Sequence, residues 1–354
     1  MNNFSNWHNC QLYIEDLDRT LSHVVNINKL CNKSVLLTGA TGTIGSFLVD
    51  TLIRFNQISN ANIRLYLGGR SVEKLRNLFG TQKNVEYLSY DMFVPLNFNK
   101  QFDYVIHSAG NAHPAAFNGN PVGTTLGNIE STYRLLEYLK DNQGKRLLYV
   151  SSGEVYGIGD LSLESFDESY SGCVDVLSPR SCYPLSKRMT ENLCASYWKQ
   201  YGVETVIVRP CHTYGPFMTE SDNRAHAQFL QNAVCGKKIV LKSLGTQMRS
   251  YNYVADCSSA LLSVLLSGNP GEAYNLANSN SVLTIADLAK KIASAVDCEV
   301  VFDIPNATDL ANQSPIPKQV LSSKKIERLG WKPAFSVDEG ISHTLNMLRQ
   351  IIKC

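Results

Sequence analysis

The sequence predicts an α/β protein built around a doubly wound parallel sheet, with a smaller C-terminal lobe. Short apolar runs of strand length alternate with segments of helical length from residue 33 to residue 210, as in strands joined by crossover helices. Beyond residue 210 the alternation becomes irregular, and the loops are rich in Gly, Asn, Ser and Pro. We therefore expect a helical extension at 1–32, an α/β domain at 33–210, and a lobe at 211–354 that interleaves with that domain.

The expected strands are runs rich in Val, Leu, Ile and Tyr, which are residues that favour strands. They lie at 34–38, 63–67, 85–88, 104–107, 146–151 and 205–209. The segments between them predict helices, which lie at 44–55, 72–78, 124–140 and 183–200. Ligands of such sheets bind beyond the carboxyl ends of the strands, and the polar motifs of this chain all follow predicted strands.

The bulk composition excludes several classes of protein. A net charge of +2 gives no electrostatic case for binding nucleic acid or an anionic membrane, and no apolar stretch is long enough to span a bilayer. The ten cysteines are scattered and form no C-x-x-C pair, which indicates reduced thiols rather than disulfides or a metal site. The N-terminus lacks the pattern of a signal peptide. We expect a cytoplasmic protein without a metal.

The first motif is the turn TGATGTIG at 38–45, which follows a predicted strand and opens a predicted helix. Small residues let the backbone approach a pyrophosphate, and the helix N-terminus offers unpaired N–H groups. In this context the turn predicts dinucleotide binding. The expected contacts are Gly39, Thr41, Gly42, Thr43, Ile44 and Gly45.

The second predicted strand leaves the choice between NAD and NADP open. An NAD site usually has an acidic residue there for the ribose hydroxyls, but 61–72 contains no Asp or Glu and Arg70 stands at this place. Arg70 could hold a 2′-phosphate, stack on the adenine, or be an exposed arginine. Asp91, after the third strand, is a candidate for the adenine amino group, with a turn cap as its alternative.

The candidate catalytic pair is Tyr183 and Lys187, which lie one turn apart on one face of a predicted helix. A phenol titrates near pH ~10, so a nearby ammonium and a cationic nicotinamide would favour the phenolate that can act as a base. An aromatic core residue followed by a solvated lysine is the alternative for such a pair.

Seven motifs in order give the chain a family resemblance. They are TGATGTIG, the pair Asp91-Met92, HSAG at 107–110, SSGEVYG at 151–157, Tyr183-x-x-x-Lys187, RPCHTYGP at 209–216 and LGWKP at 329–333. Over 33–350 the chain resembles the extended short-chain dehydrogenase/reductase family of nucleotide-sugar epimerases, dehydratases and decarboxylases. Its central stretch is similar to UDP-glucuronate decarboxylases and dTDP-glucose 4,6-dehydratases.

The resemblance implies a Rossmann domain, an NAD cofactor and a nucleotide-diphosphate sugar as substrate. Tyr183 removes the proton of the C4 hydroxyl, Ser152 hydrogen-bonds that hydroxyl, and Lys187 lowers the tyrosine pKa and holds the cofactor ribose. Glu154 acts on C5 of the resulting 4-ketone, or is a buried carboxylate satisfied by backbone donors. Further cofactor contacts are implied for Met92, Ser108, Ala109, Gly110 and Pro210.

For the substrate, the resemblance places Arg249 at the diphosphate, with Arg224 and His212 as weaker candidates. His113 is expected near the sugar, or is a solvated loop histidine. A homodimer is implied through the helices near 124–140 and 183–200.

Three departures from the family pattern leave the second half of the reaction open. Gly153 replaces the serine of decarboxylases and the aspartate of dehydratases, His212 replaces an asparagine, and Gly123 and Leu126 replace lysines found in decarboxylases. The alternatives to decarboxylation or dehydration are a 4-epimerase or a 3,5-epimerase. A dinucleotide-binding sensor without catalysis is the most distant alternative.

Overall fold

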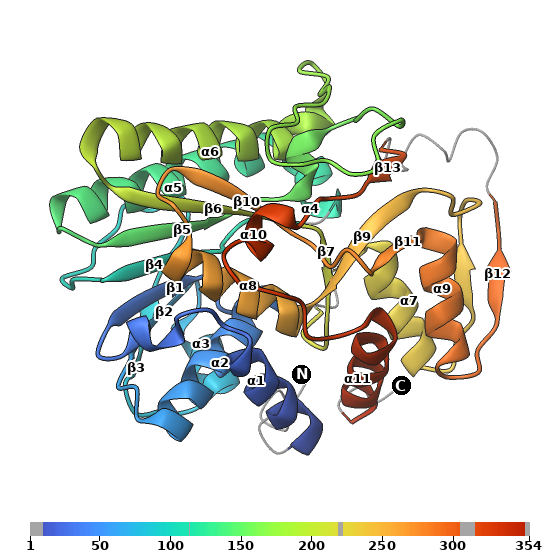
Figure 1. The fold of residues 1–354 in the computed structure, drawn as a ribbon, viewed down its shortest axis with the longest axis horizontal. Helices are drawn as coiled ribbons and strands as arrows, with labels where there is room; N and C mark the ends of the chain where they lie inside the picture. Colours follow the sequence, from blue (N-terminus) through green and yellow to red (C-terminus); the bar gives the residue numbers. More distant parts are fainter. Residues whose placement is uncertain (1–9, 113, 219–221, 305–315, 351–354) are drawn as a thin grey trace.

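The computed structural model describes residues 10–112, 114–218, 222–304 and 316–350. The larger half is a parallel sheet of seven strands in the order β10-β6-β5-β4-β1-β2-β3 (Figure 1). Its strands are β1 (Ser34–Thr38), β2 (Arg64–Gly69), β3 (Val85–Ser89), β4 (Tyr104–His107), β5 (Arg146–Val150), β6 (Glu204–Pro210) and β10 (Glu272–Leu276). The strand order reverses between β1 and β4, which is where doubly wound sheets bind their ligands.

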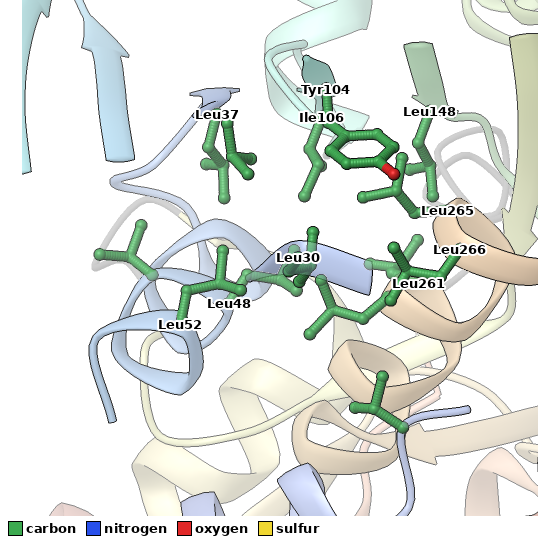
Figure 2. Packing of buried hydrophobic residues seen from close by; sticks show 14 of the residues in the cluster. Leu30, Leu37, Leu48, Leu52, Tyr104, Ile106, Leu148, Leu261, Leu265 and Leu266 are labelled. Atoms are coloured by element: carbon green, nitrogen blue, oxygen red, sulfur yellow. The ribbon is translucent and has the colours of Figure 1, made fainter. Parts of the chain in front are cut away.

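Helices cover both faces of this sheet, and the pleat of β1 decides which side chains meet them. Val35 and Leu37 pack with the helices of one face, whereas Leu36 packs with those of the other. The first face carries α2 (Thr43–Ser59), α3 (Val72–Phe79) and α8 (Val254–Ser267); the second carries α5 (Pro121–Asp141) and α6 (Cys182–Tyr201). Figure 2 shows leucines of α2 and α8 packed against Leu37, Ile106 and Leu148 of the strands.

The smaller half is a lobe with its own core. Its central strand β9 (Met248–Tyr253) pairs with β7 (His212–Tyr214), β11 (Val282–Thr284) and β13 (Lys318–Gln319). A separate pair, β8 (Ile239–Leu241) and β12 (Val300–Phe302), lies beside α7 (Ala225–Val234) and α9 (Ile285–Ser294), and α11 (Val337–Arg349) closes the lobe. Between β9 and β11 the chain returns to the large sheet through α8 and β10.

Short helices shape the connections: η2 (Ile27–Leu30), α4 (Pro114–Gly119), η3 (Gly153–Tyr156), η4 (Pro179–Ser181) and α10 (Lys324–Glu327). Helix α5 begins before the expected residue 124, because Asn120 caps the N–H of Gly123 and a proline occupies the first turn.

Helix α1 (Gln11–Ser22) lies against both halves. The Tyr13 hydroxyl donates to Asp50 on α2 at 2.6 Å. From the lobe, the Tyr253 hydroxyl donates to Asp16 at 2.6 Å and His343 on α11 bonds the same carboxylate at 2.9 Å. Asp50 is 37 residues from Tyr13, and Tyr253 and His343 are 237 and 327 residues from Asp16, so the helix joins segments that are distant in sequence.

The predicted fold class, a doubly wound parallel sheet with a smaller lobe, is confirmed. The prediction of reduced thiols is wrong for Cys235, which is disulfide-bonded. Eight other cysteines among the described residues are free. No helix in the described part of the chain is long and apolar enough to cross a membrane, and the described residues contain no cluster of three or more His, Cys, Asp or Glu suited to a metal.

Candidate active site

The turn between β1 and α2 is glycine-rich for steric reasons. Gly39 has a φ of +76°, and a Cβ there would lie 2.7 Å from the backbone of Ser108 and Ala109. A Cβ on Gly45 would lie 2.1 Å from the Gly39 carbonyl oxygen. Gly42 caps α2 without a side-chain hydrogen bond, so no cap blocks the first N–H groups of the helix. This arrangement fits the pyrophosphate of a dinucleotide.

A cavity of about 200 Å³ extends from this turn to Tyr183. The predicted cofactor residues that line it are Gly39, Gly42, Thr43, Ile44, Gly45, Ser108, Gly110, Tyr183, Lys187 and Pro210. Thr41, Arg70, Asp91, Met92 and Ala109 are not among its lining residues. Arg70 is exposed, and Asp91 accepts a hydrogen bond from the N–H of Phe93 at 2.9 Å, which is the turn cap that was its alternative role.

Tyr183 and Lys187 are both buried at the floor of this cavity. The Tyr183 ring stacks on that of Phe117, with 5.1 Å between the ring centroids. The Lys187 ammonium donates a hydrogen bond to the Val150 carbonyl at 2.8 Å. Burial raises the pKa of Tyr183 to about 12, with a contribution from the Glu154 charge. Burial lowers the pKa of Lys187 to about 8. Without ligands the phenol is therefore protonated at neutral pH.

Two groups oppose the raised pKa of Tyr183. A hydrogen bond with Ser152 and the positive charge of Arg224 both lower it. The Lys187 ammonium lies 4.7 Å from the centre of the Tyr149 ring and 5.8 Å from that of Tyr183.

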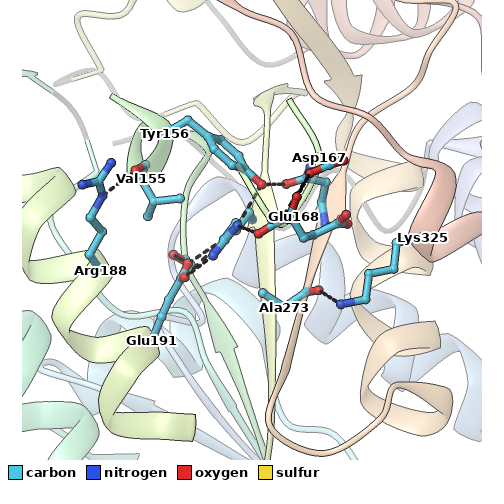
Figure 3. A network of polar contacts seen from close by, with 12 residues as sticks. Val155, Tyr156, Asp167, Glu168, Arg188, Glu191, Ala273 and Lys325 are labelled. Atoms are coloured by element: carbon cyan, nitrogen blue, oxygen red, sulfur yellow. Dashed lines mark hydrogen bonds and ion pairs between the residues drawn. The ribbon is translucent and has the colours of Figure 1, made fainter. Parts of the chain in front are cut away.

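An ion pair fixes the helix that carries Tyr183 and Lys187 (Figure 3). Glu191, one turn after Lys187, accepts hydrogen bonds from Arg209 on β6 at 2.6 Å and from Ser151 after β5 at 2.5 Å. The Tyr156 hydroxyl accepts from Arg209 at 2.8 Å. Because Glu191 and Arg209 are both largely buried, loss of either would leave an uncompensated charge. The network holds α6 in register with the strand ends.

Glu154 lies where two cavities meet. Its N–H donates to the Ser152 hydroxyl at 3.1 Å, and its carboxylate lies 3.4 Å from the Arg180 guanidinium. Glu154, His212 and Arg224 line both the first cavity and a second one of about 340 Å³. Arg180 was not predicted as a site residue, although it stands three residues before Tyr183 in a segment on which the resemblance rests.

The second cavity lies between the lobe and the larger half, and it is lined by the predicted substrate residues Arg249, Arg224 and His212. Arg249 is 4% exposed and donates to the carbonyls of Met248 and Ile316, and it has no ion pair among the described residues. Arg224 pairs with Asp222. Burial lowers the pKa of Arg249. Predicted His113 lies outside the described residues.

Three buried polar atoms on this cavity have no hydrogen-bond partner in the described part of the chain. They are His212 Nδ1, His226 Nε2 and Gln247 Oε1. Burial lowers the pKa of His212 well below its usual value, with Arg249 adding to the effect, and burial lowers that of His226 to about 3. Both imidazoles are therefore neutral. Unsatisfied buried groups that face a cavity are suited to bind a polar ligand.

The sheet order, the glycine turn and the buried Tyr–Lys pair define a dinucleotide-binding α/β protein. The family model described as "NAD dependent epimerase/dehydratase family" matches residues 35–277. UDP-glucuronic acid decarboxylase 1 of Xenopus tropicalis is 30% identical, over 95% of this chain and 78% of the relative. Human dTDP-D-glucose 4,6-dehydratase is 29% identical, over 90% of each chain.

The crystal structure of DesIV, a dTDP-glucose 4,6-dehydratase from Streptomyces venezuelae with NAD and TYD bound, has the same fold. It superposes with a TM-score of 0.76 at 23% identity, over 90% of this chain and 97% of that one. The chain therefore belongs to the NAD-dependent epimerase/dehydratase family. It is an enzyme of that family, and its cofactor is NAD.

Proposed function

We propose that the chain oxidises C4 of a nucleotide-diphosphate hexose to a ketone and then releases the C5 carboxylate as carbon dioxide. The position of Glu154 carries this proposal, because it lines both the cavity that contains Tyr183 and the cavity that contains Arg249. A ligand that spans both cavities can meet the base, the carboxylate and the buried arginine together. Relatives named UDP-glucuronic acid decarboxylase support this choice of second step.

In the first step Tyr183 Oη takes the proton of the C4 hydroxyl, and Ser152 Oγ holds that hydroxyl in line. NAD bound at the glycine turn supplies the hydride acceptor. Since the pKa of Tyr183 is about 12 in the ligand-free chain, this base needs the added positive charge of the loaded site. Lys187, fixed by Val150, contributes charge and a ribose contact.

In the second step the bond between C5 and its carboxylate breaks, and its electron pair forms an enolate with the C4 ketone. C5 then takes up a proton, and the C4 ketone is reduced back to a hydroxyl by the hydride removed in the first step and the proton held by Tyr183. Glu154 positions the C5 end of the sugar, together with Arg180 at 3.4 Å from its carboxylate. The diphosphate lies against Arg249, since a guanidinium suits bidentate phosphate binding. The neutral His212 and His226 add hydrogen bonds there without added charge.

Gly153 favours a second candidate, a 4-epimerase. Dehydration needs an acid for the departing C6 hydroxyl, and a glycine at this position supplies none. Decarboxylation and epimerisation both proceed without that acid, so both agree with the site.

One experiment separates these reactions. The purified holoenzyme is incubated with UDP-glucuronic acid, UDP-glucose or dTDP-glucose, and the products are analysed by mass spectrometry and NMR. We expect UDP-glucuronic acid to lose carbon dioxide. Loss of water from dTDP-glucose would establish a dehydratase, and an unchanged mass with inverted C4 would establish an epimerase. If no sugar transiently reduces the cofactor, the proposed C4 oxidation is wrong.

We also propose that the enzyme is a cytoplasmic homodimer. Exposed Val122, Leu126 and Tyr133 lie at helical spacing on α5, which packs against α6. The eight free thiols support a reducing compartment, and the disulfide-bonded Cys235 is the exception. Light scattering after size exclusion should give twice the chain mass, and Tyr133→Glu should give the monomer. A monomeric wild-type protein would contradict this.

A further inference from the structure

Gly153 leaves a space beside Glu154 that residues of the lobe fill. Its backbone is not in the left-handed region, so its conformation does not require glycine. An added Cβ would meet Leu321 Cδ1 at 3.1 Å and the Pro210 carbonyl at 3.4 Å. At 3.5 Å it would meet Gln319 Cδ, the amide carbon of that side chain. The amide of Gln319 therefore adjoins the place where a side chain at 153 would begin.

Gln319 has the properties of a ligand contact rather than of a packing residue. It is 3% exposed, and its amide nitrogen has no hydrogen-bond partner among the described residues. It lines the first cavity together with Ser152, Glu154 and Tyr183. A buried donor without an acceptor is unfavourable, and an oxygen of a ligand in this cavity would satisfy it.

The pairing of β13 with β9 determines the direction of the Gln319 side chain. Strand β13 pairs in parallel with β9, and Gln319 is the register partner of Arg249. Register partners project from the same face of a sheet. Gln319 and Arg249 therefore stand side by side, with Gln319 reaching the first cavity and Arg249 the second. A ligand that contacts both Arg249 and Tyr183 would therefore lie next to Gln319.

We propose that Gln319 is a specificity-determining sugar contact, whose amide N–H donates to a hexose oxygen on the Glu154 side and replaces the side chain that Gly153 lacks. This inference rests on the proposed function and deepens it. An amide donates a hydrogen bond but gives up no proton at neutral pH. The contact therefore holds the oxygen of the C5 substituent without expelling it as water, and it selects sugars that carry an oxygen there.

Binding tests the contact independently of turnover. Calorimetric titration of the holoenzyme with UDP, UDP-xylose, UDP-glucose and UDP-glucuronic acid measures what the sugar, and its C5 substituent, add to affinity. In Gln319→Leu we expect UDP and UDP-xylose to bind as in wild type, and the advantage of UDP-glucose or UDP-glucuronic acid over UDP-xylose to fall about tenfold. Gln57→Leu, an exposed glutamine on α2, is the matched control and should change nothing. An unchanged advantage, or an equal loss for UDP, overturns the inference.

A structural role and a ligand role predict opposite changes in stability. Leucine removes the unsatisfied donor at similar volume, so the ligand-free Gln319→Leu protein should unfold at the same temperature as wild type or higher. A clear drop in the melting temperature would show that Gln319 serves packing and overturn the inference. Gln319→Asn retracts the amide without removing it, and its sugar affinity should lie between those of wild type and Gln319→Leu.

A double substitution tests whether a side chain at position 153 can restore the sugar affinity that is lost without Gln319. Gly153→Ser combined with Gln319→Ala returns a hydroxyl to position 153 and removes the side chain it would crowd. We expect this double variant to bind UDP-glucose more tightly than Gln319→Ala alone; equal affinity counts against the inference. If the wild type oxidises none of the sugars yet their affinity depends on Gln319, the proposed function fails and this contact stands. If the wild type oxidises the sugars and their affinity is independent of Gln319, the proposed function stands and this contact fails.

Discussion

The two cavities that meet at Glu154 are built in different ways. The first is lined mainly by short segments that follow β1, β4, β5 and β6, and by α6, and the lobe adds His212, Arg224 and Gln319. Its buried lysine is satisfied by a backbone carbonyl. The second is lined mainly by β7, β9 and α7 of the lobe, and the larger half adds Glu154 and Arg180. Its two histidines and Gln247 have polar atoms without partners in the described part of the chain. Most of the first cavity is thus built by the large sheet and its helices, whereas most of the second is built by the lobe.

The largest expected effect tests the catalytic pair of the first cavity. Tyr183→Phe should lower the rate of C4 oxidation about 10³-fold, because the proton acceptor is lost. The readout is the absorbance of reduced nicotinamide in a single turnover. Tyr87→Phe, on β3 and away from both cavities, is the control and should retain its rate. If Tyr183→Phe turns over at a rate near that of wild type, Tyr183 is not the base.

Glu154→Gln tests the junction between the cavities. We expect the second step to slow about 10²-fold, so that reduced cofactor and 4-keto sugar accumulate. The Glu154 charge raises the pKa of Tyr183, and the neutral amide should therefore lower it. Because the phenolate is the active form, the rise of the oxidation rate with pH should move to lower pH. A profile that stays in place, or moves to higher pH, contradicts the electrostatic coupling.

Arg249→Lys tests the second cavity alone. The point charge of lysine cannot form the bidentate contact, so affinity for UDP should fall about tenfold while affinity for NAD remains. Titration of each ligand by fluorescence measures both constants. Lys242→Arg, an exposed cation on the same cavity, is the control. If NAD affinity falls in parallel with UDP affinity, the division of labour between the cavities is wrong.

The smallest effect concerns Arg70, which directly follows β2. The side chain is exposed and lies outside the lining residues, so Arg70→Ala should leave NAD affinity within about twofold. If Arg70 contacts a 2′-phosphate, NADP affinity should fall several-fold in this variant. If Arg70→Ala changes the affinities for NAD and NADP equally little, Arg70 is a surface arginine without a role in cofactor binding.

Sequence reasoning reached the first cavity more completely than the second. The glycine turn follows β1, Ser152 follows β5 and Tyr183 lies in the first turn of α6, so each belongs to a local motif next to the large sheet. Gln319 is 166 residues from Gly153 and belongs to a two-residue strand, which has no periodicity to detect. His226 becomes a cavity residue only because α7 packs there. Arg180 could have been found, since it stands only three residues before Tyr183.

Helix α1 is hydrogen-bonded to both halves of the molecule. Through Tyr13 it holds the helix behind the glycine turn, and through Asp16 it holds β9 and α11. The strand it holds in the lobe is the one that carries Arg249. Hinge motion between the halves would have to break these hydrogen bonds, so α1 opposes such motion. Helix α1, which lies outside the matched family model, thus ties together the two halves whose residues line both cavities.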